Sequence, residues 1–175
     1  MEYNQSTVNY WKAFVLPYTF ALEELKTKFE IMNREAQFLE DYNPFEHIKT
    51  RLKQPESIIK KLERKSLLPT VENAQTHLQD IIGIRITCCF VEDIYHLKEV
   101  IQKREDMEVI EVKDYIANPK RNGYKSLHMI IKYPLSLNSG TKDVFAEIQL
   151  RTLAMDFWAS LEHKLYYKYE GKIPE

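Results

Sequence analysis

The chain has 175 residues, 44% of them hydrophobic, and its 25 lysines and arginines nearly balance 26 aspartates and glutamates, for a formal net charge of −1. This length suits one domain with a proper core, and the balanced charge argues against bulk electrostatic binding of nucleic acid or an anionic membrane. The four glycines form no phosphate-binding loop, neither GxxxxGK followed by Ser or Thr nor GxGxxG. No transmembrane run or signal peptide is recognisable. The adjacent Cys88 and Cys89 are expected to be buried free thiols, which fits a reducing cytoplasm.

The N-terminal third is expected to be largely helical. Residues 6–40 carry apolar side chains every three or four positions, and Pro17 within them marks either a kink or the first turn of a second helix. Residues 45–65 contain seven bases and three acids, and Pro55 is expected to open a helix there. The basic flank of that helix is either a solvated face or a clamp for a polyphosphate. The flank comprises Arg51, Lys53, Ser57, Lys60, Lys61 and Arg64.

Residues 80–91, DIIGIRITCCFV, are nearly all apolar, as expected for a central strand. Alternation sends the isoleucines at even positions to one side, and Arg85 and Thr87 to the other. Asp80 is out of phase with this pattern. It is therefore expected at the mouth of the strand, before the regular pleat, or beyond a bulge at Gly83.

The middle of the chain is expected to supply a helix over 93–104 and a strand over 108–115. Residues 116–123, IANPKRNG, have the composition of a loop. Its two bases, Lys120 and Arg121, stand where a mobile loop could close on an anionic ligand.

The next strand is expected over residues 124–133. Alternation places Tyr124, Ser126 and His128 on one face and apolar side chains on the other. Residues 138–140 then make a turn into the last strand.

The stretch from Glu147 to Lys168 begins as a strand and continues as a helix. On the strand, Glu147, Gln149 and Arg151 share one face. The helix has an apolar stripe and an opposite polar side, and Thr152 can cap its first turn. The stripe comprises Leu153, Phe157, Trp158, Leu161 and Leu165, and the polar side Asp156, Ser160, His163 and Tyr167. That polar side is equally consistent with a solvated face and with part of a site.

The polar faces of three predicted strands differ from an ordinary solvated face, which is rich in Lys, Glu and Thr. They display Arg85, Tyr124, Ser126, His128, Glu147, Gln149 and Arg151. Such a mixture indicates a binding site with convergent polar groups. Two carboxylates, Asp80 and Glu147, suit Mg²⁺ rather than zinc, and Tyr124, Arg51 and Arg85 offer planar surfaces for a base. Together these carboxylates, bases and planar side chains suit the transfer of a phosphoryl or nucleotidyl group.

Four segments of the sequence resemble the small alarmone synthetases, single-domain relatives of the RelA/SpoT-homologue (p)ppGpp synthetases. They are RLKQPESIIKKLERK (51–65), DIIGIRI (80–86), NGYKSLH (122–128) and EIQLRTLAMDFWASLEHKLYYK (147–168). The resemblance spans residues 9–175 and is to the RelP/RelQ group, in particular the RelP type. It implies an α+β fold, a mixed β-sheet flanked by helices as in nucleotidyltransferases. It also implies one synthetase domain over 1–175, with a helical segment over 6–65 and a catalytic core over 78–170.

The resemblance implies a cytoplasmic GTP pyrophosphokinase, which transfers the β,γ-diphosphate of ATP to the 3′-hydroxyl of GTP or GDP and releases AMP. By the same resemblance, Asp80 and Glu147 would hold Mg²⁺, and Glu147 would also take the hydroxyl proton. The ATP-binding residues would be Arg51, Lys53, Ser57, Lys61, Arg64 and Arg85, with Arg51 and Arg85 on either side of adenine. The GTP-binding residues would be Lys120, Tyr124, His128, Gln149 and Asp156, with Tyr124 stacked on guanine.

Two departures from the family pattern bear on function. No His-Asp dipeptide occurs, which implies synthesis without the hydrolase half of bifunctional relatives. The sequence stops at Glu175, where the family continues into helices that build a homotetramer, so these helices are expected to be absent. Single-stranded RNA is a further candidate partner. Two alternatives stay open: another nucleotidyltransferase, which would move AMP and release pyrophosphate, and a non-catalytic nucleotide- or RNA-binding module.

Overall fold

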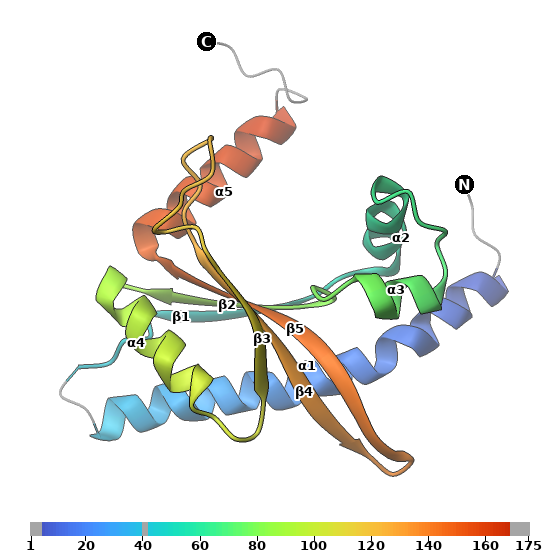
Figure 1. Cartoon of the computed structure of the whole chain (residues 1–175), viewed down its shortest axis with the longest axis horizontal. Coiled ribbons are helices and arrows are strands. Elements are labelled where there is room, and N and C mark those ends of the chain that lie inside the picture. The colour runs from blue at the N-terminus through green and yellow to red at the C-terminus, as the bar shows by residue number, and fades with distance from the viewer. Residues whose placement is uncertain (1–4, 40–41, 169–175) are drawn as a thin grey trace.

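The computed structural model describes residues 5–39 and 42–168, with side chains described for 10–39 and 42–165 (Figure 1). Residue 40 of the predicted first helix and residues 169 and 170 of the predicted core lie outside this part of the chain. In chain order the elements are α1 (Gln5–Leu39), β1 (His47–Leu52), α2 (Pro55–Arg64), α3 (Val71–His77), β2 (Ile82–Cys88), α4 (Val91–Gln102), β3 (Glu108–Asp114), β4 (Leu127–Leu137), β5 (Gly140–Thr152) and α5 (Leu153–Lys168).

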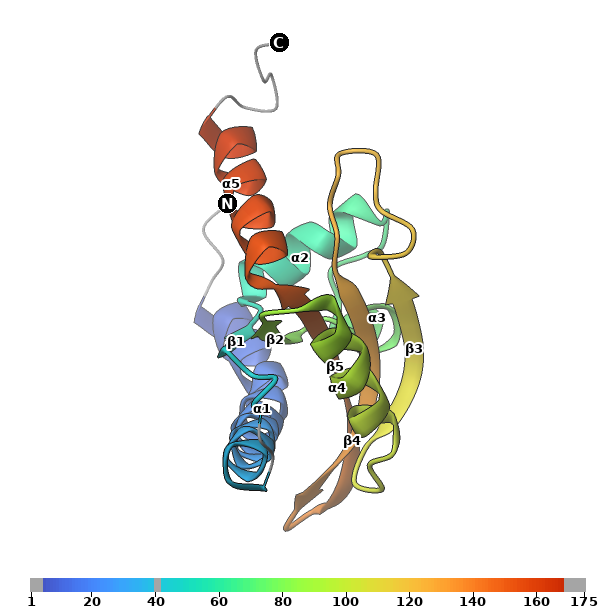
Figure 2. The ribbon, with the colours of Figure 1, turned by 90° about the vertical axis from the view of Figure 1, so that its left-hand side faces the viewer.

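The strands form one mixed sheet in the order β1-β2-β5-β4-β3. β2 runs parallel to β5, and the other neighbouring strands are antiparallel. A parallel pair needs a long crossover, and here α4, β3 and β4 all intervene in the chain between β2 and β5. Helices lie on both sides of the sheet in Figures 1 and 2, which confirms the predicted α+β class with a mixed, helix-flanked sheet.

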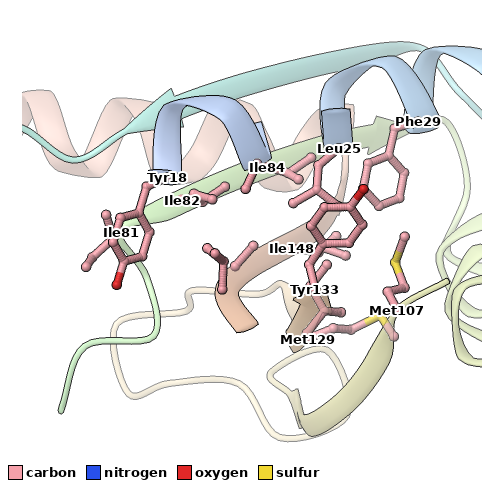
Figure 3. Close-up of a cluster of buried hydrophobic side chains, with 14 of the residues drawn as sticks. Tyr18, Leu25, Phe29, Ile81, Ile82, Ile84, Met107, Met129, Tyr133 and Ile148 are labelled. Carbon is pink, nitrogen blue, oxygen red and sulfur yellow. The ribbon is translucent and has the colours of Figure 1, made fainter. Parts of the chain in front are cut away.

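The core lies where α1 packs against the sheet. α1 runs for 35 residues through Pro17, so no second helix begins at that proline. Its Leu25 and Phe29 are fully buried and face Ile84 of β2 and Ile148 of β5 (Figure 3). Full burial of such a side chain stabilises by about 1.5–3 kcal/mol. This packing fixes which face of β1, β2, β4 and β5 turns inward and leaves the alternate face for polar groups.

In Figure 1, α2 and α5 stand well apart from each other, on the opposite side of the picture from α1. Pro55 occupies the first turn of α2, as predicted, and the buried Ile58, Ile59 and Leu62 anchor that helix. The exposed side of α2 is therefore its basic side.

The structure differs from the local predictions in three places. Residues 47–52, within the segment expected to be helical, form β1, and the short helix α3 was not predicted. β1 is a six-residue edge strand in which only Ile48 and Leu52 are apolar, and both are half-buried, so its alternation is a weak strand signal. β4 begins at Leu127, so Tyr124 and Ser126 lie in the preceding loop rather than on a strand.

α5 keeps the predicted cap but leaves its apolar stripe uncovered. The hydroxyl of Thr152 accepts a hydrogen bond from the Met155 N–H at 3.3 Å. Phe157 is 70% exposed and Trp158 47% exposed, because the helix projects from the end of β5 (Figure 2). The side chain of Tyr167 lies outside the described residues.

No helix within residues 5–39 and 42–168 is both long enough and apolar enough to span a bilayer. Cys88 is buried and Cys89 half-buried, and both thiols are free.

Candidate active site

Two adjoining rows of residues cross the polar face of the sheet. One row consists of successive partners on β1, β2, β5, β4 and β3, namely Lys49, Arg85, Gln149, His128 and Lys113. In the next row Arg51, Gly83 and Glu147 are successive partners on β1, β2 and β5. Gly83 has no side chain, so the space between Arg51 and Glu147 stays open. The sheet register thus brings together residues from distant parts of the sequence.

Asp80 lies in the loop just before β2, as one of the two expectations had it, and meets two lysines. Its Oδ2 accepts a hydrogen bond from Lys53 Nζ at 2.5 Å and another from Lys61 Nζ. Burial alone raises the pKa of the Asp80 carboxyl, but the two ammonium groups more than offset it and hold the pKa below its usual range. Lys53 is only 7% exposed, and burial outweighs its pairing with Asp80, so its pKa lies below that of an ordinary lysine.

Glu147 is held by two donors, one on each carboxylate oxygen. Nδ1 of His128 lies 3.0 Å from Oε1, and Nε2 of Gln149 donates to Oε2 at 2.7 Å. Burial by itself raises the pKa of the Glu147 carboxyl. The hydrogen bonds from His128 and Gln149 exceed that influence, so the pKa lies below its ordinary value. The carboxylate is therefore ionised at neutral pH and oriented.

The two carboxylates fit a magnesium ion. Asp80 and Glu147 line one cavity of about 420 Å³, and Oδ1 of Asp80 is buried without a hydrogen-bond partner. Mg²⁺ takes oxygen ligands, often one or two carboxylates completed by phosphate oxygens and water. Across the described ranges no three His, Cys, Asp or Glu side chains are grouped to hold a metal. An ion held by this pair would need further oxygen ligands, which phosphate groups and water can supply.

Arg51 and Arg85 stand between two cavities and line both. The cavity of about 420 Å³ contains the carboxylates, and the other, of about 490 Å³, is lined by Tyr124 and residues of α5. A further cavity of about 720 Å³ lies on α2 beside Ser57 and Arg64. A guanidinium plane can stack on a base, so the shared wall is a suitable place for one.

The loop before β4 is fastened to α5, and this places Tyr124 at the second cavity. The side-chain amide of Asn122 donates to the carboxylate of Glu162 on α5, and the Tyr124 N–H donates to Asn122 Oδ1 at 3.2 Å. Gly123 has a φ of +79°, a conformation that favours glycine. A Cβ at Gly123 would lie 3.7 Å from the Trp158 ring, so the loop runs close against α5.

Two cations lie over the Tyr124 ring. Lys120 Nζ is 4.8 Å and Arg151 Cζ 5.1 Å from its centroid, within the range of cation–π attraction. Lys120 is exposed on the loop, whereas Arg151 is buried. Of these two cations, Lys120 is therefore the one with room to move.

The sequence pattern placed Arg151 on the polar strand face with Glu147 but gave it no individual role. It is 4% exposed, and three of its nitrogens hydrogen-bond to neighbouring side chains. These bonds run to Ser126 Oγ (3.3 Å), Asp156 Oδ1 (3.2 Å), the Tyr124 hydroxyl (2.6 Å) and Gln149 Oε1 (3.1 Å). Arg85 also pairs with Asp156, at 3.0 Å, and burial followed by the charge of Arg151 lowers the pKa of Arg85.

The structure brings most of the predicted site residues together, in three groups. His128 and Gln149 contact Glu147, and Lys53 and Lys61 contact Asp80. In the third group, Lys120 lies over the Tyr124 ring, and Asp156 pairs with Arg85 and Arg151 beside the second cavity. Ser57 and Arg64 stand apart, on the cavity beside α2. The assignment of individual roles to these residues stays a prediction.

Comparison with known proteins shows which family has this sequence and fold. Residues 50–172 match the family described as the region found in RelA / SpoT proteins. The GTP pyrophosphokinases YwaC and YjbM of Bacillus subtilis are 49% and 46% identical to the chain over 94% of its length and over 79% and 77% of theirs. Small alarmone synthetase 1 from Bacillus subtilis bound to its product pppGpp superposes with a TM-score of 0.88 at 44% identity, over 95% of this chain and 84% of that one. A GTP pyrophosphokinase family protein from Streptococcus pneumoniae also gives 0.88, at 39% identity over 94% and 80%.

The fold and the site thus define a nucleotide-binding enzyme that moves a phosphate-containing group. The chain belongs to the RelA/SpoT family, and its relatives lie among the small alarmone synthetases, as the sequence motifs predicted. Its type within the RelP/RelQ group stays a prediction.

Proposed function

We propose that this GTP pyrophosphokinase transfers the β,γ-diphosphate of ATP to the 3′-hydroxyl of GTP or GDP at Glu147, giving pppGpp or ppGpp and AMP. The observation that carries the proposal is the wall formed by Arg51 and Arg85. It borders the carboxylate cavity on one side and the cavity of Tyr124 on the other. Donor and acceptor nucleotides on the two sides would meet beside Glu147. The names of the curated relatives support the same activity.

ATP would bind with adenine against Arg51 and Arg85 and with its phosphates toward α2. Lys53, Ser57, Lys61 and Arg64 supply the positive charge and hydroxyl for the phosphates. Lys53 and Lys61 now bond to Asp80, so a polyphosphate would draw these ammonium groups from Asp80. That exchange would free the carboxylate for a metal ion. A second solved small alarmone synthetase 1 from Bacillus subtilis is bound to AMPCPP, an ATP-like nucleotide, which supports an ATP site in this fold.

The acceptor would stack its guanine on Tyr124, with Lys120 displaced from the ring and Asp156 nearby. His128 bridges Tyr124 to Glu147, with its ring nitrogens 2.8 Å from the Tyr124 hydroxyl and 3.0 Å from Glu147. A nucleoside whose base lies on Tyr124 can therefore extend its ribose past His128 and Gln149 toward Glu147.

In the reaction, Glu147 would accept the proton of the 3′-hydroxyl while that oxygen attacks the β-phosphorus. The bond from the β-phosphorus to the oxygen that bridges to the α-phosphorus breaks, and AMP leaves with that oxygen. A positioned general base contributes ~10²–10⁴-fold. Held by Asp80 and Glu147, Mg²⁺ would neutralise the diphosphate and orient it. The basic side chains add charge neutralisation, the main contribution to catalysis in phosphoryl transfer.

The proposal also covers the domain organisation, location, cofactor and partners of the enzyme. We infer one synthetase domain over 1–175 that works in the cytoplasm with Mg²⁺ as its cofactor. Single-stranded RNA binding belongs to the same proposal on the strength of the family resemblance, and so does a homotetramer if the native chain carries the C-terminal helices that build it. The exposed apolar stripe of α5 supports assembly, since such a surface is usually covered by a partner.

The test is one incubation with ATP, GTP or GDP, and Mg²⁺, followed by nucleotide chromatography. We expect AMP and the 3′-diphosphorylated guanosine nucleotide in equal amounts, no product with EDTA, and far less product with the Glu147→Gln variant. Pyrophosphate with an adenylylated product would instead establish another nucleotidyltransferase. Nucleotide binding without turnover would establish a binding module.

A further inference from the structure

His128 and Gln149, the two side chains that hold Glu147, are both connected by hydrogen bonds to the buried side chain of Arg151. Nη2 of Arg151 donates to the Tyr124 hydroxyl at 2.6 Å, and the same nitrogen donates to Gln149 Oε1 at 3.1 Å. Tyr124 in turn meets His128 Nε2, and Gln149 meets Glu147 through its amide nitrogen. Arg151 thus stands behind each of the two partners of the carboxylate without touching it.

The first branch of these contacts, from Arg151 through Tyr124 to His128, fixes the tautomer of His128. A guanidinium has only donors, so the Tyr124 oxygen accepts from Arg151 and its own proton is free to be donated. The atom within reach of that proton is His128 Nε2, at 2.8 Å. Nε2 must then carry the lone pair, and the ring proton of the neutral imidazole sits on Nδ1. Nδ1 faces Glu147 Oε1 at 3.0 Å, where a carboxylate can only accept.

The second branch, from Arg151 through Gln149 to Glu147, fixes the orientation of the Gln149 amide. The amide oxygen Oε1 only accepts hydrogen bonds and the amide nitrogen Nε2 only donates them. If the amide were rotated by 180°, its oxygen would face the Glu147 carboxylate, which can only accept. Because Arg151 can only donate, it binds Oε1, and Arg85 Nη2 lies 3.5 Å from the same oxygen. The amide nitrogen is left to donate to Glu147 Oε2.

Arg151 itself is held in place by other contacts. Its Nε donates to Ser126 Oγ at 3.3 Å and its Nη1 to Asp156 Oδ1 at 3.2 Å. Asp156 lies in the first turn of α5 and Ser126 just before β4, so the guanidinium is clamped between two elements. The fork geometry of arginine allows these directions at once, which a lysine ammonium does not match.

We propose that Arg151 is a positioning residue of the synthetase reaction: it sets the tautomer of His128 through the Tyr124 hydroxyl and the orientation of Gln149 directly, so that both present N–H groups to Glu147. The consequence for the reaction rests on the proposed function of Glu147 as the base, but the hydrogen-bond assignment does not.

The direct test is the tautomer of His128 in the ligand-free protein. Long-range ¹H–¹⁵N spectra of the imidazole, recorded about two pH units above the ordinary histidine pKa of about 6.5, distinguish a protonated ring nitrogen from an unprotonated one. We expect the proton on Nδ1 in the wild type. In Tyr124→Phe, which removes only the hydroxyl from a half-buried side chain, and in Arg151→Lys, we expect an appreciable population with the proton on Nε2. A wild-type ring protonated on Nε2, or a tautomer unmoved by both variants, would overturn the proposal.

The kinetic test separates positioning from stability. Arg151→Lys breaks both branches, so kcat should fall about 100-fold, the order expected for a misplaced catalytic group. Tyr124→Phe breaks one branch and should lower kcat about tenfold, while the retained ring keeps the KM for GTP within about threefold. A loss of folded protein or a rise in KM at unchanged kcat would show a structural or stacking role instead.

The control uses a side chain without tautomers. In His128→Asn the amide nitrogen lies near the former Nδ1 and can donate to Glu147 whatever Tyr124 does. In that background, adding Tyr124→Phe should cost less than about threefold in kcat, so the two substitutions are strongly non-additive. Full additivity would refute the route through His128. If the chain made no alarmone yet the wild-type spectra gave the Nδ1 tautomer, the proposed function would fail and the hydrogen-bond assignment would stand.

Discussion

Replacing Asp80 by asparagine tests the charge cluster at the mouth of β2. Lys53 and Lys61 converge on one oxygen of Asp80, and Asp80→Asn keeps the shape while leaving the two ammonium groups facing each other without the carboxylate. Removing one partner of a buried ion pair costs about 3–5 kcal/mol. Asp80 is one-fifth exposed, so we expect the lower end, about 3 kcal/mol in the free energy of unfolding at neutral pH. For a chain of this length that lowers Tm by about 6–12 °C.

The pH dependence of the loss has a definite sign. The pKa of Lys53 is already lowered by burial, and loss of Asp80 removes the chief influences that raise it. A base whose pKa is lower in the folded state is penalised while it is protonated. The penalty is therefore fully present below the folded pKa and disappears as pH rises toward the unfolded value near 10.4. In the wild type, Asp80 has a lowered pKa, so its contribution to stability is lost as pH falls below the ordinary carboxyl range.

The assay is urea unfolding followed by circular dichroism, in EDTA, for the wild type and Asp80→Asn at neutral pH and about pH 9.5. We expect the difference in unfolding free energy between the two proteins to narrow at the higher pH. Lys65→Ala, just beyond α2 and exposed, is the matched control and should change little at either pH. A variant as stable as the wild type, or a difference that widens with pH, would refute the reasoning.

The remaining predictions concern the reaction. Glu147→Gln keeps the shape of the side chain and removes its basicity, so kcat should fall ~10²–10⁴-fold in folded protein, and wild-type synthesis would remove Glu147 from the mechanism. Arg64→Ala should raise the KM for ATP more than the KM for GTP, because we assign the cavity on α2 to the phosphates of ATP. Steady-state kinetics with each nucleotide varied in turn would measure both constants, and an equal rise in the two would contradict this assignment. Tyr124→Ala should weaken GTP or GDP about 5- to 150-fold and spare ATP, since a stacked base is worth ~1–3 kcal/mol. A lower Tm with unchanged GTP affinity would instead place the ring in the core.

The parts of the site that lie on regular, half-buried strands could be read from the sequence. Glu147 and Gln149 alternate with apolar residues on β5, and that period alone turns them to the polar face. Asp80 was located by being out of phase with β2. In each case the information is local, because the hydrophobic pattern of a few residues decides which way a side chain points.

The parts that depend on distant contacts could not be read. Arg151 has the same phase as Glu147, but its burial comes from Tyr124, Ser126 and Asp156, which lie on other elements. Lys53 looked like an exposed phosphate ligand, because nothing nearby in the sequence shows that it folds onto Asp80. Periodicity likewise gave α5 an apolar stripe without indicating how much of that stripe stays exposed.

The parallel pairing of β2 with β5 has a consequence for how the enzyme is made. β5 is the central strand of the sheet and also the last to be synthesised, so β2 has no partner on that side until residue 152 has been added. Until then β1 with β2, and β3 with β4, are separate pieces with exposed edges. Pairings of such long sequence separation form slowly, and unpaired edges favour aggregation. Asp80 and Glu147 therefore cannot come together before β5 has been made, and a nascent or truncated chain that ends before β5 has neither a complete sheet nor both carboxylates.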